Sequence, residues 1–554
     1  MIAPGPVAVN DWSNLGGYRA AKELLGNGTL PDSLSGGADV VLGMRPRNLE
    51  IVSEGVEGRA VRQEMTAVAD GATGGMIAAS LLTVPGALDF FVGGGVVYSL
   101  RAREVLFAQP REAYREPLTW LGWSRRSILL VNDPATCRDI LADSEGIFPK
   151  NDLMVGALEG LVGDSVFVSS GERWRRQRAM IDPAFSHMRI RSAFDSMARA
   201  VDDHERHLDA LAERDAPFSL DLAMSQLTAD VICRTIFSEP LSSSVAQSVF
   251  DDFLLFERSV ASVDLWQLIV GKPWADVPQP PPVRDACARI RSHIGDLLDP
   301  RLAPDASPLD DIVAAVMAAR DADSGEAFTR EELIDQIGVF FLAGHETTAS
   351  VLTWVFFVLS RQPGVVRRIR ADVERVVGDG AVGFEHVRQL PFLRNVFREA
   401  LRLYPPITFL PRVTTAATTI GGRRVKRGAM IMISPWTAHR NARLWSNADR
   451  FDPDRFEREE ASGEASGQAS VRDAGDADDA ERRGPMMSFG IGPRVCVGAS
   501  FATTEAVLII ARLVRRYDIE ALDPDAVRPV ARLTTRPAVE ITCRIRRHDD
   551  EAVP

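Results

Sequence analysis

The segment from Phe489 to Gly498, F-G-I-G-P-R-V-C-V-G, limits most strongly what this chain can fold into. A helix-like stretch, 499–517, follows it directly, so Cys496 lies just before a predicted helix N-terminus. Free backbone N–H groups and the helix dipole at such an end stabilise a thiolate. Gly490 and Gly492 allow the backbone to bend closely around the sulfur. The segment therefore predicts a loop that presents one cysteine to a ligand.

The residues around this cysteine suit a flat cofactor with an acidic edge. Gly498 leaves room for such a cofactor against the helix, Phe489 can shield the sulfur from water, and Arg494 can reach an acidic group. An isolated cysteine is more often a small buried hydrophobe, and this interpretation is kept for the other four cysteines of the chain: Cys137, Cys233, Cys287 and Cys543.

Composition excludes several classes of protein. The net charge is 64 − 76 = −12, so no general basic surface is available for nucleic acid. Apolar residues make up 45% of the 554 residues and charged residues 25%, as in a soluble globular protein. The odd number of cysteines suits a reducing compartment. No two of them have the spacing of a zinc knuckle or an iron–sulfur loop, which excludes a fused ferredoxin.

A long helix is predicted over about residues 330–361. Thr329 and Glu332 form a capping box at its start, and Pro363-Gly364 ends it. The helix is apolar nearly all round and should therefore be buried. In its middle lies A-G-H-E-T-T, residues 343–348, in which a glycine weakens the helix and a threonine hydroxyl can bond a backbone carbonyl. The hexapeptide predicts a local groove with an acid and an alcohol facing it, and an ordinary helix defect is the alternative.

Two weaker patterns lie on other predicted helices. Glu399 and Arg402 stand at i, i+3 on one helix face, and Trp174 and Arg178 stand at i, i+4 on an Arg-rich helix over 171–180. Taken alone, the first spacing is common by chance and the second predicts a solvated basic face. Elsewhere the pattern predicts a strand followed by a turn and a helix, two long helices and a Pro-rich loop: 127–131, 132–134, 186–214, 219–237 and 271–282.

In order and spacing, these four motifs resemble those of the heme-thiolate monooxygenases, the cytochrome P450 superfamily, over about residues 95–545. The chain is similar to a bacterial member. The resemblance implies a mainly α fold with small β-sheets (α+β), a triangular helix-rich prism with heme between the long central helix and the helix after the cysteine loop. It also implies a heme-dependent monooxygenase that inserts one atom of dioxygen into a lipophilic small molecule, by hydroxylation or epoxidation.

The resemblance implies a role for each motif. Cys496 is expected to be the axial thiolate ligand of heme b, iron protoporphyrin IX. The thiolate donates electron density to the iron, which favours cleavage of the O–O bond. Thr347 is the expected oxygen-binding threonine and Glu346 its acid partner, while His345 is expected to be structural or to face the pocket. The residues expected to bind the cofactor are Trp174, Arg178, Arg412, Phe489, Arg494 and Gly498.

Two further groups follow from the same resemblance. Arg455, in F-D-P-D-R-F, is the expected third member of a buried triad with Glu399 and Arg402 that holds the cysteine loop in place. The substrate pocket is expected within the largely apolar segments 147–166, 340–344 and 404–410. Its named residues are Ala343, Gly344, Ile407 and Phe409.

Electrons are expected from a separate ferredoxin or flavoprotein reductase. The 58 residues after Cys496 (554 − 496) carry no flavin or nicotinamide fingerprint. Three alternatives stay open: a heme-thiolate enzyme that uses peroxide, a non-catalytic heme sensor or carrier, and a chain without heme whose Cys496 is simply buried. The adjacent pair Glu346 and Thr347 argues against the first two.

The segments outside the resemblance carry little readable chemistry. Residues 1–94 are expected to be a Gly-rich N-terminal extension without a secretory signal, so a cytoplasmic location is expected. Its apolar stretch, 76–100, is a membrane span, a surface membrane contact or a packed extension; the last is favoured, because proline and glycines interrupt it. Residues 457–484 are acidic and low in complexity, which predicts a disordered insert, and 546–554 form a tail.

Overall fold

The computed structural model describes residues 40–45, 48–53, 118–123, 126–143, 146–150, 152–260, 280–305, 309–462 and 486–548. The chain divides into two units, residues 1–130 with 264–272 and residues 131–263 with 273–554. The cysteine loop and the long helix both belong to the second unit.

The described residues of the first unit form β-strands. β1 (Val40–Arg45) and β2 (Asn48–Ser53) pair antiparallel. β3 (Leu118–Trp123) and β4 (Arg126–Val131) follow along the chain, and β4 agrees with the strand predicted over 127–131. The apolar stretch 76–100 and its membrane interpretations lie outside the described residues.

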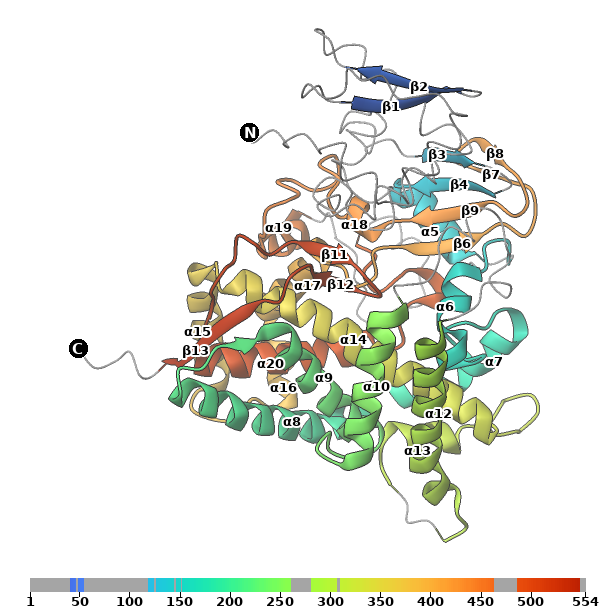
Figure 1. Ribbon diagram of the computed structural model, residues 1–554. Helices are drawn as coiled ribbons and strands as arrows, with labels where there is room; N and C mark the ends of the chain where they lie inside the picture. The colour runs from blue at the N-terminus through green and yellow to red at the C-terminus, as the bar shows by residue number, and fades with distance from the viewer. Residues whose placement is uncertain are drawn as a thin grey trace. The chain divides into compact units, whose positions relative to one another are not determined.

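The second unit is mainly helical (Figure 1). Its first helix begins as the sequence N-D-P predicts, because the side chain of Asp133 accepts from the N–H of Thr136 at 2.8 Å. The helices, including two 3₁₀ turns, are α5 (Pro134–Ala142), α6 (Asp152–Val162), α7 (Gly171–Ile181), η5 (Asp182–Phe185), α8 (His187–Glu213), α9 (Leu220–Ile236), α10 (Ser244–Val260), α12 (Pro281–Leu302), α13 (Ile312–Ala318), α14 (Arg330–Leu359), α15 (Pro363–Val377), α16 (Phe384–Gln389), α17 (Pro391–Leu403), α18 (Pro435–Ala438), α19 (Arg455–Ser462), η8 (Gly492–Arg494) and α20 (Ala499–Arg516).

α14 is the predicted long helix. The N–H of Glu332 donates to the hydroxyl of Thr329 at 3.2 Å, and the N–H of Thr329 donates to the carboxylate of Glu332 at 2.8 Å, so the capping box is present. In the described part of the chain α14 is the one helix with the length and hydropathy of a membrane span, yet 83% of its most apolar window is buried. It is therefore a core helix, with α9, α17 and α20 packed against it (Figure 1).

Small antiparallel sheets accompany the helices of the second unit. They bring together β6 (Leu410–Val413) with β9 (Met430–Ile433), β7 (Thr418–Ile420) with β8 (Arg423–Val425), β11 (Pro529–Ala531) with β12 (Thr535–Pro537), and β13 (Thr542–Arg547) with both β10 (Tyr517–Ala521) and β5 (Phe218–Ser219). A mainly helical unit with small sheets is the fold class that the sequence predicted.

Two predicted loop boundaries are wrong. Pro281 and Pro282, expected in the Pro-rich loop, are the first residues of α12, because the fixed φ of proline suits the first helical turn. Residues 457–462, expected in the disordered insert, belong to α19, since their glutamates, arginine and alanine favour a helix. The remainder of the predicted insert, 463–484, lies outside the described residues.

Candidate functional site

Cys496 lies three residues before the start of α20. Its loop is shaped by a backbone hydrogen bond and by close packing at its glycines. Its N–H donates to the carbonyl of Phe489 at 2.8 Å. Gly490 and Gly492 have φ values of 77° and 75°, which other residues rarely adopt. A Cβ on Gly492 would lie 2.7 Å from the carbonyl oxygen of Leu141. The loop therefore needs these glycines both for its bend and for its contact with α5.

Cys496 differs from the other four cysteines in its exposure. It is exposed, whereas the other four cysteines are buried, as the sequence predicted for them. Desolvation by the surrounding atoms nevertheless raises the pKa of the Cys496 thiol, and the N–H of Gly498 and the charge of Arg178 offset this rise only in part. The N–H of Gly498 therefore favours the thiolate, as the sequence predicted for the helix end, but desolvation outweighs it. A bound metal ion would remove the proton, because a coordinating thiol is deprotonated.

A short stretch of α14 is accessible although its neighbours are buried. Ala343 is exposed, and Gly344 and Thr347 are partly exposed. Positions 343 and 347 lie one turn apart on the same helix face, where the sequence predicted a groove. Gly344 also has a packing role that the sequence did not indicate, because a Cβ there would lie 2.4 Å from Cδ1 of Ile232 in α9.

Thr347 and Glu346 bind different partners. The hydroxyl of Thr347 donates to the carbonyl of Ala343 at 2.6 Å, which is the predicted kind of bond, although α14 continues unbroken. The carboxylate of Glu346 accepts from the hydroxyl of Thr534 at 2.6 Å and from Nε of Arg536 at 3.0 Å. Burial is the largest influence and would raise the pKa of Glu346, but the charge of Arg536 together with hydrogen bonds from Glu257 and Arg536 lowers it. Glu346 is therefore bound to residues that precede and form β12, whereas Thr347 is bound to its own helix.

Three cations gather at the cysteine loop, and none forms an ion pair with another described residue: Lys150, Arg412 and Arg494. Among the described residues, Arg412 and Arg494 donate only to backbone carbonyls, at 3.0 Å each, and Nη1 of Arg494 has no partner there. Burial and the charges of the two arginines hold the pKa of Lys150 well below its usual range. Burial lowers the pKa of Arg412 and that of Arg494 to about 10.

This arrangement fits the expected heme. Buried cations are costly without an anion, and the two carboxylates at the edge of heme b would supply one. A Cβ on Gly498 would lie 3.9 Å from Sγ of Cys496, so the glycine keeps the space beside the sulfur open. Arg412 and Arg494 were expected at the carboxylates, and Lys150 was not.

α7 contacts the cysteine loop through the two residues that the sequence singled out. The guanidinium of Arg494 lies 4.4 Å from the ring centre of Trp174, a cation–π contact. Arg178 donates to the carbonyl of Val495 at 2.7 Å and to Asp182 at 2.5 Å. Arg178 is therefore already paired within the protein, unlike the three cations, and its contact with a cofactor stays a prediction, as does that of Trp174.

Glu399, Arg402 and Arg455 come together as one buried cluster. Their side chains are exposed by 0%, 0% and 2%. Arg402 donates from Nε and Nη2 to the two oxygens of Glu399 at 2.7 and 2.8 Å, and Nε of Arg455 donates to Oε1 of Glu399 at 3.0 Å. The structure therefore groups the three residues as the sequence did.

This triad reaches the cysteine loop through His439. Nη1 of Arg402 donates to the carbonyl of His439 at 2.7 Å. The ring nitrogen Nε2 of His439 accepts from the N–H of Met487 at 3.0 Å, and the hydroxyl of Ser488 donates to the carbonyl of Leu401 at 3.1 Å. Met487 and Ser488, which lead into the cysteine loop, are therefore hydrogen-bonded to His439 and to α17, which also carries two members of the triad.

The expected pocket residues Ile407 and Phe409 lie in the segment that connects α17 to β6, and both are partly buried. Part of the 404–410 segment is plain core, because Tyr404 stacks on Trp354 of α14 with ring centres 4.2 Å apart. The geometry leaves the substrate roles of Ile407 and Phe409 as predictions.

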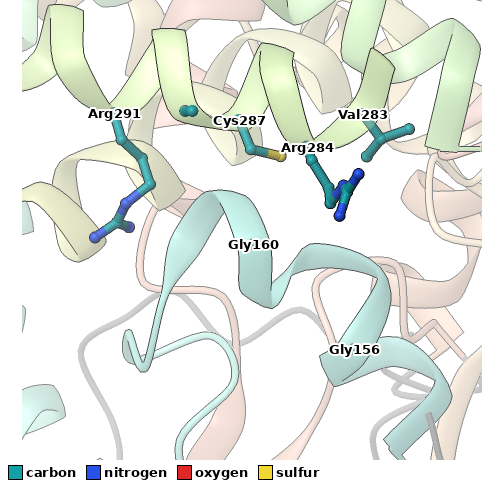
Figure 2. Close-up of a pocket in the computed structure, with 7 residues that line it drawn as sticks. Gly156, Gly160, Val283, Arg284, Cys287 and Arg291 are labelled. Atoms are coloured by element: carbon teal, nitrogen blue, oxygen red, sulfur yellow. The ribbon is translucent and has the colours of Figure 1, made fainter. Parts of the chain in front are cut away.

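A cavity of about 430 Å³ lies between α6 and α12 (Figure 2). Cys287 of α12 faces Gly156 and Gly160 of α6 across it, and Arg284 borders it. Gly156 and Gly160 belong to the expected pocket segment 147–166, whereas Ala343, Gly344, Ile407 and Phe409 are not among the residues that line this cavity.

Sequence reasoning missed four charged residues near the site or in the core: Lys150, Glu257, Glu505 and Arg536. Burial raises the pKa of Glu505 in α20 well above its usual range, which the contact with Thr348 opposes. A signal for Glu505 was present, because it is a lone acid in the apolar run of α20. The other three stand alone in their segments, with no local pattern.

Replacing Lys150 with glutamine should weaken heme binding about tenfold, because a hydrogen bond to a charged group contributes about 1.5 kcal/mol. The same change should stabilise the heme-free protein, because it removes one of three crowded cations. Heme transfer to apomyoglobin and thermal unfolding of the heme-free protein measure the two effects. Lys426→Gln, at an exposed lysine, is the control; equal transfer rates for both variants would contradict the assignment.

The chain is similar to known proteins over most of its length. The sequence profile described as Cytochrome P450 matches residues 91–541, and one described as CinA C-terminal domain matches residues 50–117. Cyclooctatin synthase of Streptomyces melanosporofaciens is 31% identical over 384 residues, covering 69% of this chain and 77% of the relative. Cyclooctat-9-en-7-ol 5-monooxygenase of the same organism is 30% identical over 405 residues, covering 72% and 81%.

A solved cytochrome P450DA heme domain has the same fold, with a TM-score of 0.67 and 21% identity over 82% of this chain and 94% of that one. This likeness concerns the fold, whereas the profile match covers most of the sequence together with the cysteine loop and the α14 motif. The chain therefore belongs to the cytochrome P450 family, the heme-dependent monooxygenases whose iron is bound by a cysteine thiolate.

Proposed function

We propose that Cys496 binds the iron of heme b, that Lys150, Arg412 and Arg494 hold its carboxylates, and that the chain oxidises a lipophilic small molecule with dioxygen. The observation that carries this proposal is the exposed cysteine beside three cations that form no ion pair with another described residue, one of which, Arg494, lies in the cysteine loop. Heme bound through a thiolate supplies the oxygen-activating chemistry. The protein supplies ligation, placement and protons.

The accessible face of α14 supplies the room and a hydroxyl. Ala343 leaves space for substrate and oxygen, and Thr347 lies one turn away on the same helix face. Because Thr347 already donates its proton to the carbonyl of Ala343, its hydroxyl oxygen can accept a hydrogen bond from a water molecule that delivers a proton. Glu346 is the proposed source of that proton.

The proposed substrate is lipophilic, because the predicted lining residues Ala343, Gly344, Ile407 and Phe409 are apolar or lack a polar side chain. One relative is named for cyclooctat-9-en-7-ol. That compound is the first to test, followed by a panel of fatty acids, terpenoids, steroids and aromatics.

We propose a cytoplasmic location and a separate ferredoxin or flavoprotein reductase as electron donor. Five free cysteines without a disulfide suit a reducing compartment. The alternative of membrane contact through residues 76–100 concerns a segment outside the described residues.

Turnover with ¹⁸O₂ tests the function. The heme-loaded protein, NADPH, a plant-type ferredoxin and its reductase are combined with cyclooctat-9-en-7-ol or a compound of the panel that changes the heme spectrum. We expect NADPH oxidation that depends on substrate and reductase, with one labelled oxygen in the product. Product formation from hydrogen peroxide without reductase would indicate the peroxide-using alternative. A spectral change without NADPH oxidation would indicate a sensor.

Replacing Thr347 with alanine should leave the heme spectrum intact and cut product per NADPH by about 100-fold, because a positioned proton-transfer group contributes at least that much. The lost product should appear as hydrogen peroxide. Product and peroxide per NADPH are the measurement. Thr503→Ala is the control, because that hydroxyl also donates to the carbonyl four residues before it, at 2.8 Å, in α20. Coupled turnover at the wild-type level in Thr347→Ala would rule out the proposed role.

A further inference from the structure

A buried cluster of ionisable side chains joins α10, α14, α9 and β12 beside Glu346. Glu257 of α10 and His345 and Glu346 of α14 each contribute one polar atom, and these atoms lie within 4.8 Å of one another. Arg536 of β12 binds Glu346 and also donates to Asp221 of α9 at 2.7 Å. Three carboxyl groups therefore share one guanidinium and one imidazole.

The contacts of the His345 ring indicate which of its two nitrogens carries a proton. Its Nδ1 lies 3.3 Å from the carbonyl oxygen of Phe341, which can only accept, so Nδ1 carries the proton. Burial lowers the pKa of His345 to about 4, so the ring is neutral and Nε2 has a bare lone pair. Nε2 lies 3.4 Å from Oε1 of Glu257. Neither atom has a hydrogen-bond partner among the described residues.

An ionised Glu257 would face this lone pair and the negative charge of Glu346. A protonated Glu257 can donate to either acceptor instead. Burial first, and then the charge of Glu346, raise the pKa of Glu257 well above its usual range. In the resulting cluster the carboxylates of Glu346 and Asp221 pair with the guanidinium of Arg536, and Glu257 and His345 are neutral.

A metal ion is the other possible occupant of these three side chains, but the surroundings oppose it. Arg536 donates to both oxygens of Glu346, so a divalent ion would lie beside a guanidinium and compete with it. Zinc also needs its ligand atoms at about 2.0–2.2 Å from the metal, so the Glu346 oxygen would have to leave Arg536 to bind it. A single proton satisfies Glu257 and His345 without displacing Arg536.

We propose that Glu257 stores a proton and passes it to Glu346, as a positioning residue for proton delivery toward Thr347. In this step an O–H bond breaks on Glu257 and one forms on Glu346, so the summed charge of the pair does not change. Glu257 is 12% exposed and Glu346 3%, so Glu257 is the one placed to regain a proton from solvent. The inference rests on the proposed role of Glu346.

Infrared spectroscopy of the heme-loaded protein at neutral pH tests the inference, because a protonated carboxyl has its own C=O band. Glu257→Gln should remove one such band, and Glu257→Asp should restore it. Asp252→Asn should leave the bands unchanged, because Asp252 is also on α10 but pairs with Arg289 at 2.7 Å. The band of Glu505 should persist in all three variants.

Glu346→Gln should shift the Glu257 band without removing it, because Glu346 is the neighbour of that proton. An unchanged spectrum in Glu257→Gln would show that Glu257 is ionised and would overturn the proposal. Loss of the band on adding Zn²⁺ to the wild type would show a metal site instead. The band is read without turnover, so its absence is distinct from failure of the proposed monooxygenase function.

Discussion

Replacing Cys496 with serine should abolish the red-shifted Soret band that carbon monoxide gives with the reduced, thiolate-ligated protein. Among the described cysteines Cys496 alone is exposed, and its loop holds Arg494, one of the three cations proposed to bind the heme edge. Serine keeps the size of the side chain but replaces the thiol with an alcohol, which gives up its proton far less readily. We expect complete loss of the band and of most of the bound heme, measured by the difference spectrum and by heme per polypeptide.

Cys287→Ser is the matched control. Cys287 is buried in α12 and lies outside the cysteine loop, beside the cavity between α6 and α12 (Figure 2), so its replacement should leave the band unchanged. A Cys496→Ser protein that keeps the wild-type band would refute ligation by this sulfur.

The raised pKa of Cys496 adds a pH dependence to the same experiment. Below that pKa the thiol carries a proton that iron binding must release, so heme affinity should rise with pH, by about tenfold per unit. The rise should stop once the pH passes the pKa of the free thiol. The serine variant should lack this dependence, since its alcohol is protonated throughout.

The sequence predicted the parts of the fold and site that local patterns specify. The capping box at Thr329 and Glu332 marks the start of α14, and the glycines before Cys496 mark its loop. Glu399 and Arg402 are three residues apart, so one helix turn is enough to pair them. Arg455 was grouped with them by resemblance, and the structure places it 3.0 Å from Glu399.

The parts that the sequence did not predict depend on tertiary contacts of single residues. Arg536 lies 190 residues from Glu346 and carries no motif, yet it binds both carboxylate oxygens. Lys150 is brought to the other two cations by a backbone bridge with Arg412, in a segment without a pattern of its own. The raised pKa of Cys496 has a related cause, because the desolvation comes from the packed surroundings, whereas the helix end favours the thiolate.

Replacing Glu399 with glutamine should lower the free energy of unfolding by about 3–5 kcal/mol, the usual cost of removing one partner from a buried ion pair. Glutamine is nearly the same size, so the loss does not come from a cavity. It leaves Arg402 and Arg455 charged and 0% and 2% exposed, without the carboxylate that both donate to. Denaturant unfolding of the heme-loaded protein measures the effect. Glu457→Gln is the control, since this glutamate is 46% exposed and pairs with Arg368 at the surface, where such a pair contributes about 0–1 kcal/mol.

The Glu399 variant should also loosen the cysteine loop at a distance. Arg402 holds His439, and His439 accepts from Met487 at the entrance to that loop, so a displaced Arg402 should change the position of the sulfur. We expect part of the heme in the folded variant to give a carbon monoxide spectrum without the thiolate band, whereas Glu457→Gln should give the wild-type spectrum. A Glu399→Gln protein that loses stability but keeps the full thiolate band would restrict the triad to supporting α17 and would contradict its proposed hold on the cysteine loop.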